Sequence, residues 1–312
     1  MTDLTIRPYA PGDAAALCDV FTEVEVANGG EPEHTEADMR NLVEAWVRDH
    51  ANDTRLVMAG DRMVAAGLLL TPPPGGQRID LLGAVRPDFQ GRGIGREMLT
   101  WQFDRARSIH ADVAADHDWH AETSANAADK SAIALFERFE MSPVRYFFGM
   151  EASLDGVPSV ELPDRIRVTP YTDDLSEAVY ETHMAAFADH WGFQQRPYEM
   201  WVKATLQSEE FRPDLSRIGF DGPDIAGYVL AYNAPGNVEY VGQVGTRREW
   251  RRRGLASALL AESMAAGAKD GKTSAKLGVD ADSPTGAVGV YERAGFRTCQ
   301  KYVVYRTPLE QA

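Results

Sequence analysis

The sequence predicts an α/β (α+β) protein that contains two successive copies of one fold, each a mixed sheet with helices on its faces. Two observations support this prediction. Three motifs recur in the same order in both halves of the chain, and each half alternates strand-like and helix-like segments in the same order. The length of 312 residues is enough for two domains that each bury a core.

Three pairs of matching segments define the internal repeat. They align a proline-tyrosine turn, a glycine-rich stretch and an aromatic-Glu-Arg motif with their counterparts. The pairs are 6–17 with 168–179, 85–99 with 246–260, and 131–141 with 286–296. Between the copies, EASLDGVPSVELPDR (151–165) contains two prolines and a glycine, which is typical of a linker. We therefore predict an N-terminal domain at 1–152 and a C-terminal domain at 163–312.

Each copy is expected to follow the same order of elements. A short strand leads into a helix, a hairpin follows, and a further strand ends at the glycine-rich stretch, where a long helix begins. A strand, a helix and a last strand complete the copy. In the first copy these segments include 4–8, 55–70, 80–85 and 96–109. In the second copy they include 166–169, 216–233, 239–244 and 257–270.

The composition is that of a globular, acidic protein. The formal net charge is -15 at pH 7, and no apolar run approaches the roughly 18 residues that span a bilayer. This charge opposes nucleic acid and anionic membranes at long range, so we expect neither as a partner. Cys18 and Cys299 lie far apart, and the N-terminus lacks a signal-peptide pattern. These features predict a cytoplasmic protein without a disulfide framework.

Both copies place a loop of the pattern Q/R-x-x-G-x-G/A between a predicted strand and a predicted helix. The first N–H groups of a helix are unpaired and, together with the helix dipole, bind anions. Glycine allows close approach of the backbone, and arginine adds a planar fork for phosphate oxygens. The spacing matches neither the dinucleotide fingerprint nor the P-loop. The two loops are Gln90-Gly91-Arg92-Gly93-Ile94-Gly95 and Arg251-Arg252-Arg253-Gly254-Leu255-Ala256.

The stretch VRPDFQGRGIG (85–95) and the motif YERAGF (291–296) resemble those of the GNAT superfamily of acyl-CoA-dependent N-acetyltransferases. The resemblance extends over nearly the full length of both halves. The second half, with AFADHWG (186–192) and VDADSPTGAVGVYERAGF (279–296), is similar to the halves of mycothiol-synthase-like and other actinomycete tandem acetyltransferases. The resemblance implies two tandem GNAT domains, each with a mostly antiparallel central sheet, and acetyl-CoA as the co-substrate.

The resemblance also implies how the coenzyme is held. The amides of the two loops would bind its pyrophosphate, and its pantetheine arm would pair with the strand before each loop. These strand positions are Ala84 and Val85 in the first copy and Val244, Gly245 and Thr246 in the second. Arg247 and Arg248 precede the second loop and are candidate partners of the coenzyme's third phosphate.

In this family a tyrosine near the sulfur commonly protonates the leaving thiolate. Tyr291 stands at that place in the second copy, whereas the first copy has Phe136, which has no proton to give. We therefore expect the C-terminal domain to be catalytic. The N-terminal domain is expected to bind acyl-CoA and to be catalytically degenerate.

The general base has two principal candidates. Family members often carry a glutamate on the strand six residues before the position of Thr246, but that residue is Tyr240 here. Glu239 is one residue away and would need a bulge to face the site. His190 and Asp189, in a loop after a predicted helix, are the alternatives, and His190 is favoured because imidazole titrates near neutral pH.

The stretch DHDWH (116–120) raises the question of a metal site. Alternate residues of a strand point to opposite faces, and metal sites usually collect ligands from separate elements. We interpret the stretch as a polar loop that enters a strand, and we expect no metal.

The predicted function is transfer of acetyl from acetyl-CoA to a primary amine of a small molecule, by direct attack in a ternary complex. The alternatives are a non-catalytic acyl-CoA-binding sensor, a transferase for a longer acyl group, and a transferase that acts on a protein amine. A tandem chain can reproduce within one polypeptide the pairing of single-domain relatives, so the chain is expected to be a monomer or a homodimer.

Overall fold

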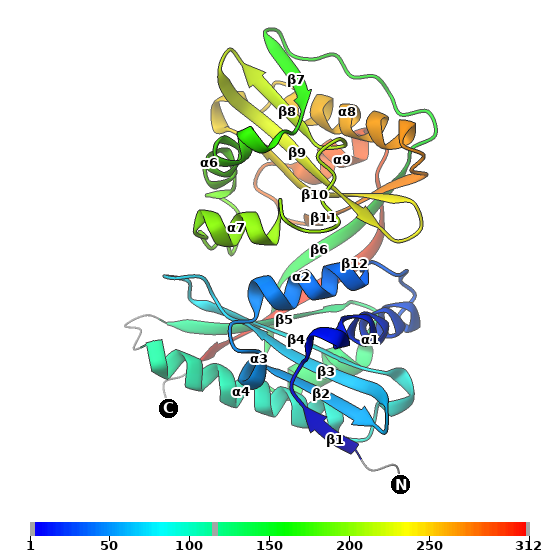
Figure 1. The fold of residues 1–312 in the computed structure, drawn as a ribbon, viewed down its shortest axis with the longest axis vertical. Coiled ribbons are helices and arrows are strands. Elements are labelled where there is room, and N and C mark those ends of the chain that lie inside the picture. The colour runs from blue at the N-terminus through cyan, green and yellow to red at the C-terminus, as the bar shows by residue number, and fades with distance from the viewer. Residues whose placement is uncertain (1–3, 114–117, 310–312) are drawn as a thin grey trace. The chain divides into compact units, whose positions relative to one another are not determined.

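The computed structural model describes residues 4–113 and 118–309. The chain forms two compact units, labelled by their elements in Figure 1. The N-terminal unit contains residues 1–145 and 302–312, and the C-terminal unit contains residues 146–301. These units are defined by their internal contacts. The domain boundaries expected from the sequence, 1–152 and 163–312, describe the two duplicated segments instead, and they stay a prediction.

The N-terminal unit is a mixed sheet with helices on both faces. Its strands lie in the order β1-β2-β3-β4-β5-β12, and every neighbouring pair is antiparallel except the parallel pair β4–β5. Its elements are β1 (Leu4–Arg7), α1 (Ala14–Ala27), α2 (Glu36–Trp46), α3 (His50–Asp53), β2 (Thr54–Ala59), β3 (Arg62–Leu70), β4 (Arg78–Val85), α4 (Ile94–Val113), β5 (Trp119–Asn126), α5 (Lys130–Arg138) and the segment Tyr302–Leu309 of β12 (Arg297–Leu309).

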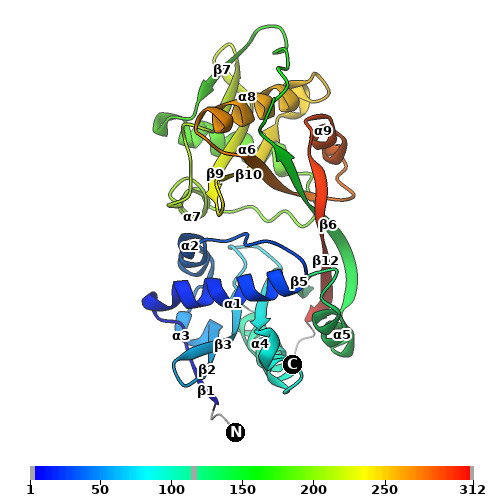
Figure 2. The same cartoon turned by 90° about the vertical axis from the view of Figure 1, so that its right-hand side faces the viewer.

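Helices α1 and α4 cover opposite faces of this sheet (Figure 2). Leu17 of α1 belongs to one buried cluster with Leu68 of β3. Phe103 of α4 belongs to another with Leu69, the next residue of β3. Consecutive strand residues point to opposite faces, so an unbroken apolar run in β3 supplies both cores.

The C-terminal unit repeats this arrangement. Its strands lie in the order β6-β11-β10-β9-β8-β7, and β10–β11 is its parallel pair. Its elements are the segment from Tyr146 of β6 (Ser142–Ser153), β7 (Ile166–Pro170), α6 (Ser176–Phe187), α7 (Tyr198–Ala204), β8 (Arg217–Asp221), β9 (Asp224–Ala234), β10 (Val238–Thr246), α8 (Leu255–Lys269), β11 (Ser274–Asp280), α9 (Ala287–Arg293) and β12 up to Lys301.

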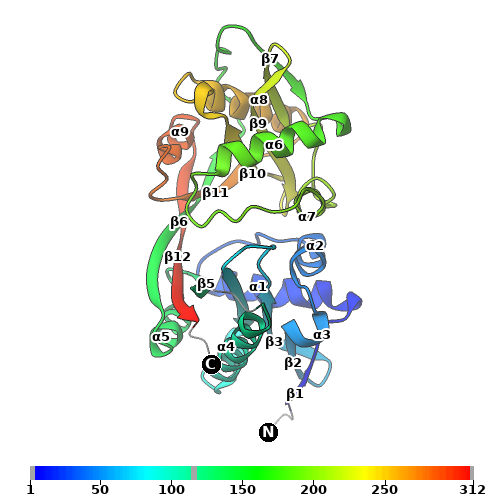
Figure 3. The same ribbon diagram turned by 90° about the vertical axis from the view of Figure 1, so that its left-hand side faces the viewer.

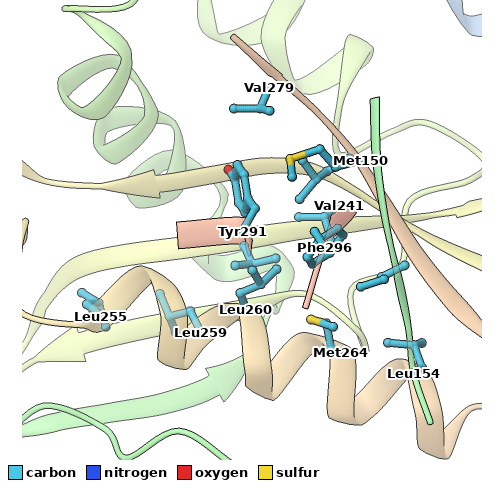
Figure 4. Close-up of a cluster of buried hydrophobic side chains, with 14 of the residues drawn as sticks. Met150, Leu154, Val241, Leu255, Leu259, Leu260, Met264, Val279, Tyr291 and Phe296 are labelled. Atoms are coloured by element: carbon cyan, nitrogen blue, oxygen red, sulfur yellow. The ribbon is translucent and has the colours of Figure 1, made fainter. Parts of the chain in front are cut away.

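Two buried clusters hold the C-terminal unit together. Val229 of β9 packs with the apolar face of α8, and Tyr228, one residue earlier, packs with residues of α6 and α7. Figure 3 shows α6 crossing the strands of this unit, and Figure 4 shows the row that Leu255, Leu259 and Met264 form along α8. The predicted class, a mixed and mostly antiparallel sheet flanked by helices in two tandem copies, is confirmed.

The pairing of the last strand of each copy differs from what the sequence predicts. Each copy was expected to finish its own sheet. Instead, the segment 302–309 of β12 pairs with β5 in the N-terminal unit, with Tyr305 opposite Thr123. β6 pairs with β11 in the C-terminal unit, with Met150 opposite Leu277. The two strands have similar apolar patterns, so the sequence alone does not say which sheet each one completes.

The helices of the described residues include none that is long and apolar enough to cross a membrane.

Candidate active site

The parallel strands of each unit separate after three paired positions. β10 pairs with β11 from Val238 to Tyr240, and β4 pairs with β5 from Arg78 to Asp80. Beyond these residues the described ladders end, although β10 continues to Thr246. The backbone groups on the open side of each strand are therefore available to an extended ligand that pairs as a strand does.

The loop after each diverging strand has the same left-handed pattern. In the C-terminal unit Arg252 has φ 62° and Gly254 has φ 83°, and α8 begins at Leu255. In the N-terminal unit Gly91 has φ 73° and Gly93 has φ 89°. Positive φ favours glycine, so Arg252 adopts a strained conformation where the other copy has a glycine. Each loop is followed at once by a long helix, α8 or α4, whose first amides have no partner within the helix.

A cavity of about 650 Å³ lies at each gap. The C-terminal cavity brings Tyr291 and His190 together with most of the residues predicted to hold the coenzyme, namely Val244, Thr246, Arg251, Arg252, Gly254, Leu255 and Ala256. Gly245 and Arg253 are not among its lining residues. The N-terminal cavity is lined by every coenzyme residue predicted for that copy, Ala84, Val85, Gln90, Gly91, Arg92, Gly93, Ile94 and Gly95.

The first residue of each loop motif braces the loop. Arg251 Nε donates to the carbonyl oxygen of Thr246 at 3.2 Å, and Arg251 Nη2 donates to that of Ala186 at 2.9 Å. In the other copy Gln90 Nε2 donates in the same way to the Val85 carbonyl oxygen at 3.1 Å. The long polar side chain thus ties the loop to the end of its strand, and its donor groups are engaged by carbonyl oxygens of the protein.

Arg247, Arg248 and Arg253 also contact other residues of the protein. Arg247 donates to Thr182 Oγ1 of α6 at 3.2 Å and does not line the cavity. Arg248 lines the cavity and forms an ion pair with Asp189, and its Nε lies 2.8 Å from Asp189 Oδ2. Arg253 lies over the ring of Trp250. Arg248 therefore fits a phosphate partner better than Arg247.

Tyr291 stands at the inner wall of the C-terminal cavity. It lies on α9, is 9% exposed, and packs against Phe296 with ring centroids 6.0 Å apart. In Figure 4 the hydroxyl end of its ring points away from α8. Burial, and then the nearby Tyr240, raise the pKa of Tyr291 to about 12. The phenol therefore keeps its proton near neutral pH and can act as a proton donor.

His190 lies in the loop after α6 and lines the same cavity as Tyr291. Its ring contacts the ring of Phe187, with centroids 4.3 Å apart. Burial, and then the charge of Arg251, lower the pKa of His190, while Asp280 and Asp189 oppose this shift. The imidazole is therefore neutral near pH 7 and can accept a proton.

Glu239 does not line the cavity. Its side chain is fully buried, and Ser263 Oγ of α8 donates to its Oε1 at 2.6 Å. The bulge in β10 lies between Val241 and Gln243, beyond Glu239, so it does not turn this carboxyl toward the site. Ile79, at the equivalent position of β4, is buried in the same way. The expectation that Glu239 is the general base therefore finds no support in the geometry.

The buried Glu239 predicts a pH-dependent stability. Burial raises its pKa, and in the described structure Oε2 has no hydrogen-bond partner. A carboxyl whose pKa is higher in the folded state loses its stabilising contribution as pH rises through that value. Glu239→Gln is expected to unfold at higher denaturant concentration than the wild type at pH 7–8 and at a similar concentration at pH 4. An equal change in the denaturant midpoint at both pH values would contradict this explanation.

Phe136 lines the N-terminal cavity at the place that Tyr291 holds in the other copy. It lies on α5, is buried, and packs against Tyr305 with ring centroids 5.4 Å apart. The two cavities have similar volumes and loops, but the N-terminal one lacks a phenol at this position.

Comparison with known proteins agrees with this geometry. The model of the Acetyltransferase (GNAT) family matches residues 17–141 and again residues 176–296. The chain belongs to the GNAT acetyltransferase family. It is a tandem GNAT protein and an acyl-CoA-dependent N-acetyltransferase, and members of this family use acetyl-CoA as co-substrate.

Curated relatives and solved structures cover most of this GNAT chain. The mycothiol acetyltransferase of Salinispora arenicola is 29% identical, with 94% of each chain covered. That of Salinispora tropica is 30% identical, with 77% of this chain and 76% of the relative covered. A GCN5-related N-acetyltransferase from Sphaerobacter thermophilus has a TM-score of 0.80 at 27% identity, with 98% and 96% covered. A tandem GNAT protein from the clavulanic acid biosynthesis pathway has a TM-score of 0.68 at 17% identity, which shows the fold alone.

The structure describes the DHDWH stretch of this GNAT chain only in part. Asp116 and His117 lie outside the described residues. His120 Nε2 lies 3.0 Å from Glu122 Oε1, which also accepts a hydrogen bond from Arg306. No group of three or more potential metal-ligating side chains occurs among the described residues.

Sequence reasoning missed a buried polar chain beside the gap of the second GNAT copy. His183 Nδ1 of α6 lies 2.6 Å from the hydroxyl of Tyr228, and this hydroxyl also reaches Gln243 Oε1 at 3.4 Å. Gln243 follows the bulge of β10. The three residues come from separate elements and share no sequence spacing, so only the folded structure shows their proximity.

Proposed function

We propose that the C-terminal unit transfers acetyl from acetyl-CoA to a primary amine of a small molecule, by direct attack in a ternary complex. The single observation that supports this most is the contrast between two otherwise similar cavities, of which one contains Tyr291 and the other Phe136. We infer that the N-terminal unit binds acyl-CoA without turnover or with weak turnover. A sensor function of that unit is the second candidate.

Acetyl-CoA fits the C-terminal cavity by its chemistry. The pyrophosphate would accept hydrogen bonds from the amides of the loop at the start of α8. The pantetheine amides would pair with the open side of β10 near Val244 and Thr246. Thr246 Oγ1 is buried and, within the described residues, has no hydrogen-bond partner, so it offers a further polar contact there.

Two side chains of the cavity provide the proton transfers. The amine must lose a proton as it attacks the thioester carbonyl, and neutral His190 would accept it directly or through one water. The carbon–sulfur bond then breaks, and Tyr291 would give its proton to the leaving thiolate. The products are the acetylated amine and free coenzyme A, and proton exchange with solvent restores both side chains.

The pH profile tests the role of His190. The pKa of His190 is lowered from its ordinary value of about 6.5. We therefore expect kcat/KM to stay constant from neutral pH to below pH 6.5 and to fall only at lower pH. His190→Gln should lower kcat by about 10²-fold or more and remove this acidic limb. The measurement is the pH dependence of kcat/KM at constant ionic strength. An unchanged limb in His190→Gln would exclude His190 as the base.

The function itself is tested by thiol release. Purified protein is mixed with acetyl-CoA and a panel of primary amines that includes amino sugars, arylalkylamines, polyamines, lysine peptides and a mycothiol-type precursor amine. Mass spectrometry then confirms the acetylated product. We expect turnover with a small amine and none without an amine. Saturable acetyl-CoA binding without turnover on any amine would favour the sensor function, and preference for a longer acyl-CoA or a peptide would favour those alternatives.

A further inference from the structure

The two cavities have the same volume of about 650 Å³, but they differ in the strands that line them. The N-terminal cavity is lined by both parallel strands of its unit, β4 and β5. The lining described for the C-terminal cavity includes β10 but no residue of β11. We call the part of the N-terminal cavity between the parallel strands and α4 the inner chamber. Its lining residues are Ala66, Gly83, Ala84, Leu99, Gln102 and Thr123.

A single side chain accounts for much of this difference. Gly83 of β4 and Val244 of β10 each stand ten residues before the loop glycine of their unit, Gly93 or Gly254. Gly83 has no side chain and is exposed, although it lies within a strand. Val244 packs against the buried cluster of its unit, which includes Leu277. The valine therefore covers, in the C-terminal unit, the place where the inner chamber opens in the N-terminal unit.

The facing strand adds a second difference. Thr123 of β5 and Leu277 of β11 each follow the last residue of the parallel ladder of their unit. Leu277 is 3% exposed and belongs to the same buried cluster as Leu260 of α8. Thr123 has a shorter side chain and lines the cavity, as does Leu99, which stands at the place of Leu260. Aliphatic side chains thus fill the gap in the C-terminal unit, whereas the cavity enters it in the N-terminal unit.

Gln102 closes the inner chamber. Among the residues of α4 that line the cavity, it is the farthest from the coenzyme loop. Its side chain is buried, and Nε2 donates to the carbonyl oxygens of Leu68 at 2.9 Å and of Leu82 at 2.7 Å. These hydrogen bonds hold the amide in place, with Oε1 3.8 Å from the position of a Cβ on Gly83. The chamber is therefore a mainly apolar space with a fixed polar end.

The path of the coenzyme leads to this chamber. In the binding mode expected for this unit, the pyrophosphate lies at the loop before α4 and the pantetheine arm pairs with β4 at Val85 and Ala84. In the same direction the next residue of β4 is Gly83. The acyl group at the end of the pantetheine arm would therefore lie where the inner chamber begins.

We propose that the inner chamber binds the acyl group of an acyl-CoA whose chain is longer than acetyl. The inference rests on the part of the proposed function that gives the N-terminal unit an acyl-CoA, and it adds the chain length that this unit prefers. A propionyl or butyryl chain would bury its additional methylene groups against the apolar walls, and an acetyl group has none to bury. The C-terminal cavity, which is filled at this place, would keep acetyl as its acyl group.

The preference is tested by calorimetric titration of the full chain with acetyl-CoA, propionyl-CoA and butyryl-CoA. Each methylene group that the chamber buries should lower the Kd about fourfold, so butyryl-CoA should bind one of two sites roughly tenfold more tightly than acetyl-CoA. A gain below threefold at both sites overturns this inference alone. A single site for every acyl-CoA also overturns the binding role proposed for the N-terminal unit. Turnover is measured separately and tests the C-terminal unit.

Two variants that copy the C-terminal unit assign the gain to the inner chamber. Gly83→Val and Thr123→Leu should each reduce the gain from acetyl-CoA to butyryl-CoA at least threefold. The Kd for acetyl-CoA is the internal control and should change less than twofold, because the C-terminal cavity has valine and leucine at these places. A Cβ on Gly83 meets the carbonyl oxygen of Ala66 at 3.6 Å and Gln102 Oε1 at 3.8 Å, which are ordinary contacts, so folding should be retained.

The matched control is Ala134→Val, which enlarges a side chain of the same cavity outside the inner chamber. It should leave the ratio of the two Kd values unchanged. A gain that persists in folded Gly83→Val or in folded Thr123→Leu overturns the inference. So does a gain that Ala134→Val removes to the same extent.

Discussion

Replacing Tyr291 with phenylalanine is expected to lower kcat by about 10²–10⁴-fold, the range typical of a lost general acid. The substitution removes one oxygen and leaves the ring that packs against Phe296. Its hydroxyl has a pKa raised to about 12, so the wild type holds the proton that the departing thiolate needs. The Kd for acetyl-CoA should remain within a few-fold, because the loop amides and β10 are untouched.

The reciprocal variant is the control. Phe136→Tyr places a phenol in the N-terminal cavity, where the coenzyme loop is complete but the described lining residues include no histidine. We expect it to fold normally and not to restore turnover in the Tyr291→Phe background. Tyr291→Phe with full kcat would show that another group or water protonates the thiolate. Recovery by Phe136→Tyr would move the chemistry to the N-terminal unit.

The sequence predicts the parts of this molecule that depend on local patterns. The hairpins expected at 55–70 and 216–233 are observed as β2–β3 and β8–β9, and they turn at Gly60 and Gly222 with the positive φ that glycine allows. The helix expected at 96–109 is observed as Ile94–Val113, and that expected at 257–270 as Leu255–Lys269. The repeat made these predictions stronger, since each element had to satisfy two independent stretches of sequence.

The sequence does not determine which distant residues are in contact, or where the register of a strand shifts by one residue. A single inserted residue at the bulge of β10 shifts the equivalence of the two copies by one, so that Glu239 corresponds to Ile79 and is buried. The same shift places Tyr240 on the exposed face. Asp189 gives Arg248 a partner from a different element, and no spacing in the sequence indicates that ion pair.

Substitution of a loop glycine is expected to have the second large effect, and it allows each cavity to be tested on its own. Gly254 has φ 83° at the start of α8, and Gly93 has φ 89° at the start of α4. Valine in the left-handed region costs roughly 1–2 kcal/mol, and it would also stand where the coenzyme approaches the backbone. Gly254→Val is therefore expected to weaken acetyl-CoA binding in its own cavity more than tenfold and to abolish turnover. Gly93→Val should remove the other site and leave turnover largely intact.

Calorimetric titration with acetyl-CoA distinguishes these outcomes, with two sites expected in the wild type and one in each variant. Gly254→Asn is the matched control, because asparagine tolerates the left-handed region and is a favourable helix N-cap. If Gly254→Asn folds well and still fails to bind, the side chain blocks the approach of the phosphates; if it binds, backbone strain explains the valine variant. Loss of turnover in Gly93→Val instead of Gly254→Val would reverse the assignment of the two units, because Tyr291 and Gly254 line the same cavity.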